Sequence, residues 1–464
     1  MIAGSIGLER LEGLLDEAAR RPRRTLVSLT VAVGSCDPSA IAFGSRMAAD
    51  RWFCWEQPDR DGFAVAGIGS AHEVVSRGEG RFDDVVSDCA DIAANRLADE
   101  PGDLPAAAGP VWVGGFAFAP EGGATAPWSS LPPALVHLPE LSIARVAGIG
   151  YLTLSAVVSP GDDPAERAAR LRSRLASVRE HGLPLFDPSP GGTLVRSVRP
   201  PGDFEDGVAR AVERIRAGAL RKVVLAREVE VEASSAHDPA ALFGALRELF
   251  PACFCFCVGT PEAAFVGASP ELLVRRSGAV AATVALAGSA RRSADPAVDD
   301  HLGEQLLRSD KDRHEHEIVA HRIERMLRPH SVWVEAADTP GLVQVANIQH
   351  LATPIHAQLA EPRSAVELAA LLHPTPAVGG EPRDVALAAI PELEEMDRGW
   401  YAGPVGWMDA AEDGEFCVAL RSALIRDRTA RLFAGGGIVA DSDPAAELAE
   451  TEIKLDALLP LLAG

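Results

Sequence analysis

The order of apolar and polar residues predicts that the first part of the chain is built mostly from strands. Leucine and alanine recur at helical spacing in residues 1–20, which predicts an amphipathic helix there. From 25 to 158, short runs rich in β-branched and aromatic residues alternate with glycine and proline, and one clear helix, at 82–97, interrupts them. A second helix is predicted at 164–181. This pattern indicates a large, mostly antiparallel sheet.

A stretch rich in proline and glycine, at 183–204, precedes a part in which helices and strands alternate irregularly. We therefore place an approximate boundary near residue 200, which divides the chain into residues 1–200 and 201–464. No repeat of fixed period is visible. The class indicated is α+β, with helices packed against antiparallel sheets. The elements predicted after the boundary include helices at 204–217, 239–249 and 296–327, and strands at 222–232, 253–258, 264–267, 272–276 and 279–285.

Composition and charge exclude several classes of partner. The 464 residues include 44 lysines and arginines against 66 acidic residues, and the formal net charge is −22. Such a balance argues against nucleic acid and against anionic membranes as partners. It leaves open an acidic small substrate, because a pocket needs only local positive charge.

The seven cysteines are odd in number and irregularly spaced, which indicates reduced thiols rather than a disulfide framework. Cys253, Cys255 and Cys257 alternate with phenylalanines on a predicted strand, and we interpret them as core residues rather than metal ligands. Neither a signal peptide nor an apolar run long enough to span a bilayer is visible, so the expected location is cytoplasmic.

The stretch from Ala434 to Lys454 carries the densest set of chemical groups. Three consecutive glycines allow the backbone to approach a ligand closely, and a helix follows from Asp443 to about residue 462. Glu447, Glu450 and Lys454 project from one face of that helix. The spacing alone is equally compatible with a solvated helix face. Two carboxylates beside a lysine would also suit a hard cation such as Mg²⁺ and an anionic ligand.

Three further residues can do chemistry, although each also has a structural interpretation. Lys222 begins an apolar strand, and it is either solvated or, in a drier pocket, a general base. Glu271 follows a proline, and it is either a turn residue or, if desolvated, a general acid. Arg421 lies on a predicted apolar strand and needs an anionic partner there.

The segment that contains His314, Glu315 and His316 could suggest a zinc site, but helical geometry disfavours it. Neighbouring residues on a helix point about 100° apart, so three consecutive side chains cannot share one small ion. Ser309 and Asp312 predict a capped helix start just before them.

These segments occur here in one order: KVVLAR, GASPELL, LAGS, HEHEIV, HPTPAVGG, RGWYAGPVGW, ALRSALI and AGGGIV…SDP…E..ET..K. In that order they resemble the chorismate-utilising enzymes, which include anthranilate, aminodeoxychorismate, salicylate and isochorismate synthases. The resemblance is specific from about 200 to 462 and looser before. It implies a single large α+β unit of two mostly antiparallel sheets with helices packed outside. The boundary near 200 would then separate a β-rich half from a chorismate-binding half of one fold.

The resemblance also implies roles for individual residues. Glu315 and Glu450 match direct Mg²⁺ ligands, and Glu447 lies nearby and acts through water. Lys222 matches the base that activates water for attack at C2 of chorismate, and Glu271 matches the acid that protonates the departing C4 hydroxyl. The positions expected to contact the substrate are Gly288, Ser289, Ala377, Val378, Tyr401, Arg421, Gly435 and Lys454.

Within this family, three positions favour isochorismate synthase activity. Lys222 provides a base for water, which the ammonia-using members lack. Ala287 replaces the attacking lysine of aminodeoxychorismate synthases. Ala377-Val378 matches isochorismate synthases, whereas salicylate synthases carry a bulkier polar residue first. The alternatives are a salicylate synthase, which also eliminates pyruvate, and a non-catalytic homologue that binds chorismate.

The same resemblance sets expectations for partners and pathway. The chain has neither a glutamine-amidotransferase half nor a recognisable tryptophan feedback motif, so we expect no amidotransferase subunit and a monomer. The product would suit either menaquinone or siderophore biosynthesis.

Overall fold

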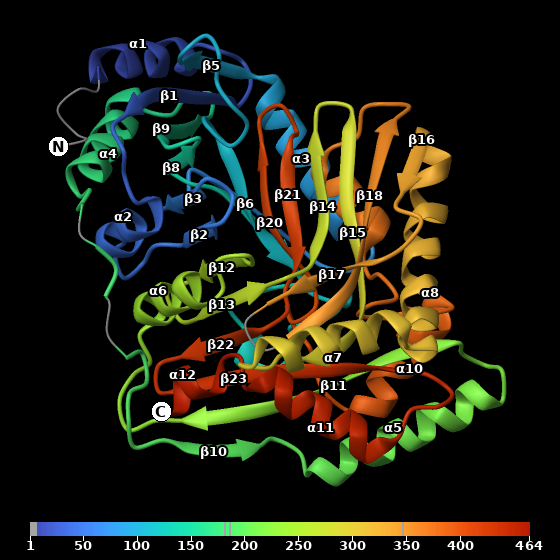
Figure 1. The fold of residues 1–464 in the computed structure, drawn as a ribbon. Helices are drawn as coiled ribbons and strands as arrows, with labels where there is room; N and C mark the ends of the chain where they lie inside the picture. Colours follow the sequence, from blue (N-terminus) through green and yellow to red (C-terminus); the bar gives the residue numbers. More distant parts are fainter. Residues whose placement is uncertain (1–6, 181, 185–186, 346–347) are drawn as a thin grey trace.

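Two large sheets, with helices on their outer faces, make up the computed structural model, which describes residues 7–180, 182–184, 187–345 and 348–464 (Figure 1). The helices are α1 (Leu8–Ala19), α2 (Pro38–Ser45), α3 (Arg81–Ala94), α4 (Pro164–Ala176), α5 (Pro201–Arg216), α6 (Pro239–Leu249), α7 (Pro296–Arg308), α8 (Asp310–Leu327), α9 (Ala365–Leu372), α10 (Arg383–Glu394), α11 (Pro444–Leu455) and α12 (Leu459–Ala463). Short 3₁₀ turns lie at Ala126–Trp128 and Arg328–His330. None of the helices in these ranges is long and apolar enough to cross a membrane.

The larger sheet contains thirteen of the described strands. In spatial order they are β10 (Leu194–Ser197), β11 (Lys222–Glu232), β23 (Thr429–Ile438), β22 (Ser422–Arg426), β13 (Ala264–Ser269), β12 (Phe254–Gly259), β2 (Trp52–Gln57), β3 (Phe63–Ile68), β8 (Leu141–Val146), β9 (Ile149–Val158), β1 (Thr25–Val33) and β5 (Arg96–Asp99), with β19 (Gly380–Glu381) beside β11.

The smaller sheet contains ten of them. In order they are β16 (Ser331–Ala336), β18 (Ile348–Leu359), β15 (Val280–Arg291), β14 (Leu272–Ser277), β21 (Gly414–Val418), β20 (Pro404–Asp409), β6 (Val111–Phe116), β7 (Ala134–Leu138) and β4 (His72–Ser76), with β17 (Gly341–Gln344) beside β18. The described pairings are antiparallel in both sheets, except that β1 and β5 run parallel.

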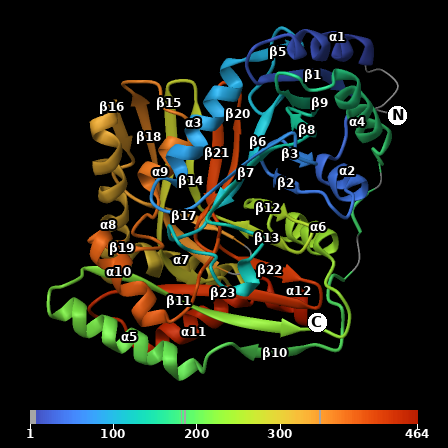
Figure 2. The same ribbon diagram turned by 180° about the vertical axis from the view of Figure 1, so that it is seen from behind.

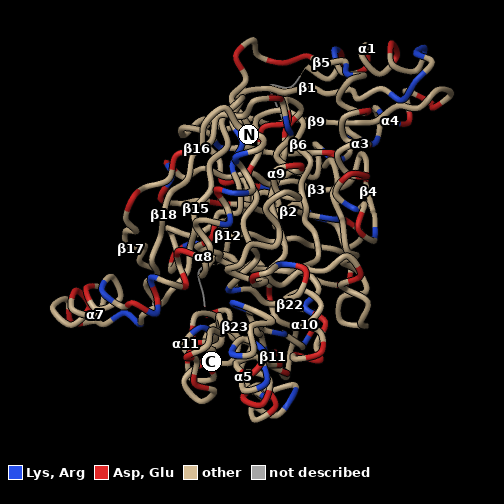
Figure 3. Tube along the Cα trace, turned by 90° about the vertical axis from the view of Figure 1, so that its right-hand side faces the viewer, with Lys and Arg blue, Asp and Glu red and all other residues tan. Residues whose placement is uncertain are grey.

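Both sheets take strands from either side of residue 200. In the larger sheet β2 pairs with β12, and in the smaller one β6 pairs with β20. The sheets face each other across an apolar core, where the rings of Phe63 on β3 and Trp407 on β20 have centroids 5.8 Å apart. Seen from behind, α3 and α9 cover the smaller sheet, while α5, α10 and α11 lie along β11 and β23 (Figure 2). Charged positions concentrate on peripheral helices such as α5 and α7, whereas the sheets carry few (Figure 3).

The cysteine interpretation is confirmed. All seven cysteines are free, and Cys253, Cys255 and Cys257 are buried. Cys257 lies opposite Cys54 in the pairing of β12 with β2, inside an apolar cluster.

Helix starts follow from a local signal that recurs along the chain. An aspartate followed by proline begins α2, α4, α6, α7 and α11, and each aspartate accepts a hydrogen bond from a backbone N–H of the first turn. The aspartate satisfies a free donor, and proline occupies a position where its missing N–H costs nothing.

The structure corrects several predicted elements. The segment PSAIAFGS lies in the region predicted to be strand-rich but forms helix α2. Nearly every one of its residues is buried, so no polar face marks helical periodicity, and the Asp37-Pro38 pair is the available signal. The helix predicted at 164–181 ends at Ala176. The helical region predicted at 296–327 consists of two helices, and Ser309 caps the second, α8, as its predicted helix start requires.

The two chain ends also differ in detail from expectation. The final helix, predicted to run to about residue 462, ends at Leu455, and α12 follows separately. The N-terminal helix spans Leu8–Ala19, and residues 1–6 of the predicted helix lie outside the described residues.

Candidate active site

A pocket lies where the two sheets meet, and residues of both sheets line it. The chain passes from β13 of the larger sheet to β14 of the smaller one through Pro270 and Glu271, and both residues face the pocket. Helix α8 contributes Glu315, and α11 contributes two glutamates and a lysine. Three segments that are distant in sequence, the β13–β14 connection, α8 and α11, therefore converge on one site.

All but one of the predicted site residues line this pocket. They are Glu271, Gly288, Ser289, Glu315, Ala377, Val378, Tyr401, Arg421, Gly435, Glu447, Glu450 and Lys454. The exception is Lys222, whose side chain lies behind Glu315 and Gly437, both of which face the pocket.

Lys222 is the first residue of β11, as predicted, but it is not a solvated strand end. It is fully buried, at 0% exposure, and its Nζ lies 2.8 Å from Oε1 of Glu315. Within the described parts of the chain this amine forms that ion pair but no hydrogen bond of acceptable geometry. Lys222 therefore lies directly behind the pocket wall, with its charge balanced by Glu315.

Glu271 is buried as well, with only 4% of its surface exposed. Burial raises the pKa of this carboxyl group to about 8, although the positive charges of Lys222 and Arg421 oppose the shift. Burial disfavours the charged form of a carboxylate. Glu271 is therefore protonated at neutral pH and can donate a proton.

The acidic groups of α11 differ from Glu271 in their environment. Nζ of Lys454 lies 2.6 Å from Oε1 of Glu450 and donates a hydrogen bond to the carbonyl oxygen of Gly435 at 2.8 Å. Burial alone would raise the pKa of Glu450, but the charge of Lys454 and its hydrogen bond lower it overall. Burial raises the pKa of Glu447, which accepts a hydrogen bond of 2.7 Å from the hydroxyl of Ser442.

These carboxylates fit Mg²⁺ better than zinc. No group of three or more histidine, cysteine, aspartate or glutamate side chains in the described ranges is already close enough to hold a metal. Mg²⁺ does not require such a cage, because it binds through one or two carboxylates and keeps several waters. Glu315 and Glu450 are close enough to raise the pKa of Glu447 by their charges. Oxygen donors of this number suit a magnesium ion that also binds a substrate.

The zinc alternative is not favoured by the geometry either. His316 is buried, and its Nε2 lies 2.7 Å from the hydroxyl of Thr353. His314 lines a separate cavity with Arg221 and Glu381. The flanking histidines therefore point away from Glu315, as helical spacing predicts.

The glycine run is required by close packing against the side chains of Glu315, Lys222 and Glu447. At Gly437, an added Cβ would lie 2.4 Å from Oε1 of Glu315 and 2.9 Å from Cε of Lys222. At Gly436, it would lie 2.9 Å from Oε2 of Glu447. Both glycines lie within β23, several residues before α11 starts. They make room for protein side chains at least as much as for a ligand.

Arg421 differs from its prediction in a way that bears on its role. It does not lie on an apolar strand but directly precedes β22, with a left-handed φ of 46°. Such a conformation is uncommon outside glycine and often marks functional sites. Arg421 faces the pocket, and burial lowers the pKa of its guanidinium.

Three carboxylates of the pocket are paired with lysines rather than with Arg421. The pairs are Glu315 with Lys222, Glu447 with Lys311 and Glu450 with Lys454. Because the lysines already balance these charges, the guanidinium of Arg421 is available to an anionic ligand.

A bulge in β15 shapes the opposite wall. The pairing of β15 with β18 shifts between Ala287 and Ser289, because Gly288 adopts a positive φ of 75°. The shift turns Ser289 toward β18, where its hydroxyl lies 3.0 Å from Nδ1 of His350. Backbone N–H groups exposed at such a bulge can bind a carboxylate.

Sequence reasoning missed several residues of this pocket, among them His350 and Lys311. His350 lines the pocket, and burial lowers its pKa to about 3, so its imidazole is neutral. Its Nε2 has no partner in the described structure, which leaves it free toward a ligand. No local pattern marked His350, because its role depends on its contact with Ser289.

Lys311 could have been found by counting. The chain has only three lysines, Lys222, Lys311 and Lys454, against 41 arginines among its 44 basic residues. Lys311 and Lys454 line this pocket, where Nζ of Lys311 is 3.6 Å from Oε1 of Glu447, and Lys222 lies behind it against Glu315. A compact amine that can titrate is not interchangeable with a guanidinium.

The three remaining predicted positions close the pocket. Ala377 and Val378 line it from the segment between α9 and β19. Tyr401 is buried and stacks on Phe433, with ring centroids 5.2 Å apart. His373 of the same HPTPAVGG segment does not face this pocket but lines a cavity behind it.

Comparisons with known proteins agree in sequence and in structure. The family described as chorismate binding enzyme matches residues 13–463. The salicylate biosynthesis isochorismate synthase of Pseudomonas aeruginosa is 36% identical over 456 residues, covering 98% of this chain and 93% of the relative. The isochorismate synthase MenF of Bacillus subtilis is 33% identical over 456 residues, with 97% and 96% covered. The solved structure of MenF, the menaquinone-specific isochorismate synthase from Escherichia coli, superposes with a TM-score of 0.78 at 26% identity, covering 98% of this chain and 99% of that one.

Proposed function

The chain belongs to the chorismate binding enzymes, and from that premise we propose that it acts as an isochorismate synthase. It is an isomerase, and its substrate and product are chorismate and isochorismate. The observation that carries the proposal is the pair formed by Lys222 and Glu271, one an amine and the other a protonated acid, buried at the same pocket. A protein that only bound chorismate would need neither.

The reaction requires one proton to be removed and another to be given. Lys222, after losing the proton that pairs it with Glu315, takes a proton from water as the water oxygen bonds to C2 of chorismate. The ring double bonds shift, the C4–oxygen bond breaks, and Glu271 protonates the departing hydroxyl, which leaves as water. Atoms balance, because one water enters and one leaves, and the step is reversible.

The remaining groups bind and orient the substrate. Arg421 and Lys454 supply positive charge for its carboxylates, together with backbone N–H groups near Gly288 and Gly435. Glu315 and Glu450, with Glu447, would hold Mg²⁺, which would neutralise a substrate carboxylate and fix its position. The wall at Ala377 offers a methyl group and no hydrogen bond to the enolpyruvyl side chain.

We expect purified protein incubated with chorismate and Mg²⁺ to form isochorismate and to release little pyruvate. Elimination of pyruvate needs the enolpyruvyl group folded over the ring, and Ala377 provides no polar contact to hold it there. Chromatography of the products, with a lactate-dehydrogenase-coupled assay for pyruvate, measures both reactions. Pyruvate in amounts equal to the chorismate consumed would instead establish a salicylate synthase.

We also expect the rate of isochorismate formation to fall as the pH rises through about 8. The pKa of Glu271 is raised to about 8 by burial, so its proton is present below that pH and lost above it. A pH–rate profile of kcat/KM from pH 6 to 10 measures this limb. Circular dichroism over the same range controls for unfolding. An alkaline limb that persists unchanged in Glu271→Gln would contradict the assignment.

A further inference from the structure

A second cavity lies behind the active site, on the other side of the segment that joins α9 to β19. It has a volume of about 660 Å³. The start of α3, the connection after β6, the end of α9 and one side of α10 form its walls. His373 and Pro374 line it, whereas Ala377 and Val378 of the same segment line the active site.

Two arginines in this cavity have donors without partners. Arg81 is 4% exposed, and its two terminal nitrogens donate only long hydrogen bonds, 3.3 Å each, to the carbonyl oxygens of Gly78 and Ala117. Arg383 donates to the carbonyl oxygen of His373 at 2.7 Å. Nε of both arginines is buried and makes no hydrogen bond in the described structure.

Neither guanidinium group forms an ion pair within the described residues, although burial lowers the pKa of Arg383 and the charges of Asp384 and Glu79 oppose that shift. Burial, together with the charge of Arg383, lowers the pKa of Arg81 to about 10. Glu79 and Glu121 oppose this shift, but both are exposed at the rim, and neither makes an ion pair with Arg81 in the described ranges. Buried cations with unsatisfied donors are costly unless an anion joins them. The first turn of α3 adds backbone N–H groups, since no side chain caps it.

The carboxylates that line the cavity are either paired, as Glu394 is with Arg398 and Asp397 with the backbone N–H groups of Gly123 and Thr125, or exposed at the rim, as Glu79, Asp83 and Glu121 are. The remaining lining is apolar and aromatic. Phe82 and Phe118 flank His373, with ring centroids 6.3 Å and 5.8 Å from the imidazole. Leu387 and Ile390 of α10 form the facing wall. Arginine forks match carboxylates, and aromatic and aliphatic walls suit a flat apolar ring. The combination therefore fits a carboxylate attached to such a ring.

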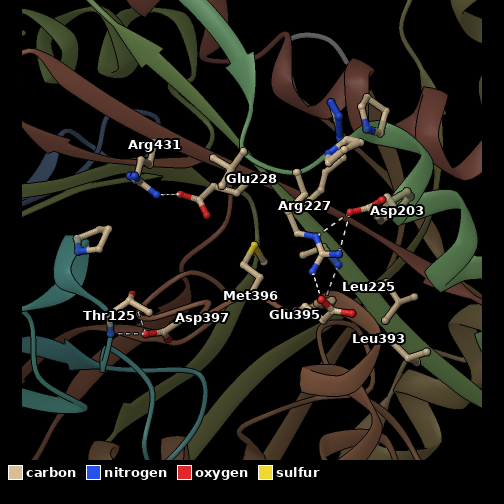
Figure 4. A pocket seen from close by; sticks show the side chains of 18 of the residues that line it. Thr125, Asp203, Leu225, Arg227, Glu228, Leu393, Glu395, Met396, Asp397 and Arg431 are labelled. Carbon is tan, nitrogen blue, oxygen red and sulfur yellow. Dashed lines mark hydrogen bonds and ion pairs between the residues drawn. The ribbon is translucent and has the colours of Figure 1, made fainter.

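A neighbouring pocket provides a contrast. It is formed by α5, β11 and the loop after α10, and Figure 4 shows Met396 between charged groups on its walls. Those groups are already paired: Arg431 with Glu228, Arg227 with Glu452, and Asp397 with Thr125. Because these charged groups already have partners, they do not indicate that the pocket binds an anion.

Arg398 connects the second cavity to the active site, because it lines both. It donates to the carbonyl oxygens of Val378 at 2.8 Å and Val224 at 2.9 Å, and its guanidinium lies 4.2 Å from the ring centroid of Phe118. A ligand that contacts Phe118 and draws Arg383 away from His373 would displace the segment that ends at Val378. A movement in the second cavity would therefore reach the active site through Arg398 and Val378.

We propose that this cavity is a second binding site, for a small carboxylate on a flat apolar ring, and that its occupancy lowers kcat in the adjacent active site. The effect on kcat rests on the proposed function, whereas the binding does not.

Fluorine NMR with 4-fluorobenzoate tests the site. We expect one bound signal that survives Arg421→Gln, a change in the active site, and that weakens at least tenfold in affinity in both Arg81→Met and Arg383→Gln. Arg77→Gln, which alters an exposed arginine outside the cavity, serves as the matched control and should bind as the unmodified protein does. Circular dichroism checks the fold of Arg81→Met, and the partly exposed Arg383 provides the second variant.

Kinetics test the connection. We expect 4-fluorobenzoate to lower kcat for chorismate without raising KM, and Arg383→Gln to remove that inhibition. Unchanged binding in both arginine variants, or a single signal that Arg421→Gln abolishes, would overturn the site. Binding without any change in kcat would overturn the connection. If the protein formed no isochorismate, the NMR result would still decide whether the site exists.

Discussion

Lys222→Gln is expected to lower the rate of isochorismate formation by about 10²–10⁴-fold, the usual contribution of a general base. Glutamine retains most of the side-chain length but cannot take a proton from water. Because Lys222 is buried beside Glu315, no other amine of the chain can replace it without a rearrangement. Single-turnover kinetics with chorismate, together with calorimetric binding, would separate lost chemistry from lost affinity.

Lys222→Arg is the matched variant for this prediction. Arginine retains the positive charge that pairs with Glu315 but remains protonated at any accessible pH. If Lys222 acts as a base, both variants lose activity and still bind chorismate. If arginine restores the rate to near that of the unmodified enzyme, the lysine acts through its charge, and the assignment as base is wrong.

Glu450→Gln is expected to weaken Mg²⁺ binding by at least about 10–100-fold, the loss seen when even an outer partner of a metal ligand is removed. Glu450 and Glu315 lie on separate helices that face one pocket, and the pKa of Glu450 is held low by Lys454, which keeps it ionised. Isothermal titration with Mg²⁺ in the presence of chorismate measures the affinity, and the Mg²⁺ dependence of turnover provides a second reading.

Glu452→Gln is the appropriate control, because Glu452 lies on the same helix but pairs with Arg227 away from the pocket. It should leave both the Mg²⁺ affinity and the rate unchanged. Glu450→Gln with the affinity of the unmodified protein would show that the metal is held elsewhere.

Much of the local structure could be predicted from the sequence, because it depends on neighbouring residues. Asp-Pro pairs begin five helices, and alternation of apolar residues marks strands such as β11. The prediction from apolar periodicity was wrong at α2, because nearly all residues of this helix are buried and no polar face shows a helical period.

The site also contains residues that local motifs predict and residues that only tertiary contacts bring there. The order of its motifs identified the family, and all but one of the site residues predicted from it line the pocket, since those residues stand in fixed local patterns. It did not reveal His350, whose place depends on a bulge at Gly288 and a contact across two strands. Nor did it predict that Arg421 precedes its strand in a left-handed conformation.

The sequence by itself determined which groups are available, namely an amine at Lys222, carboxylates at Glu271, Glu315 and Glu450, and the family they belong to. Only the tertiary structure decided their chemical states. Burial at the junction of the two sheets keeps the proton on Glu271, while Lys454 keeps Glu450 ionised on the same pocket. The reason is physical: desolvation and charge pairing are set by contacts between segments far apart in the chain, and no local pattern encodes them.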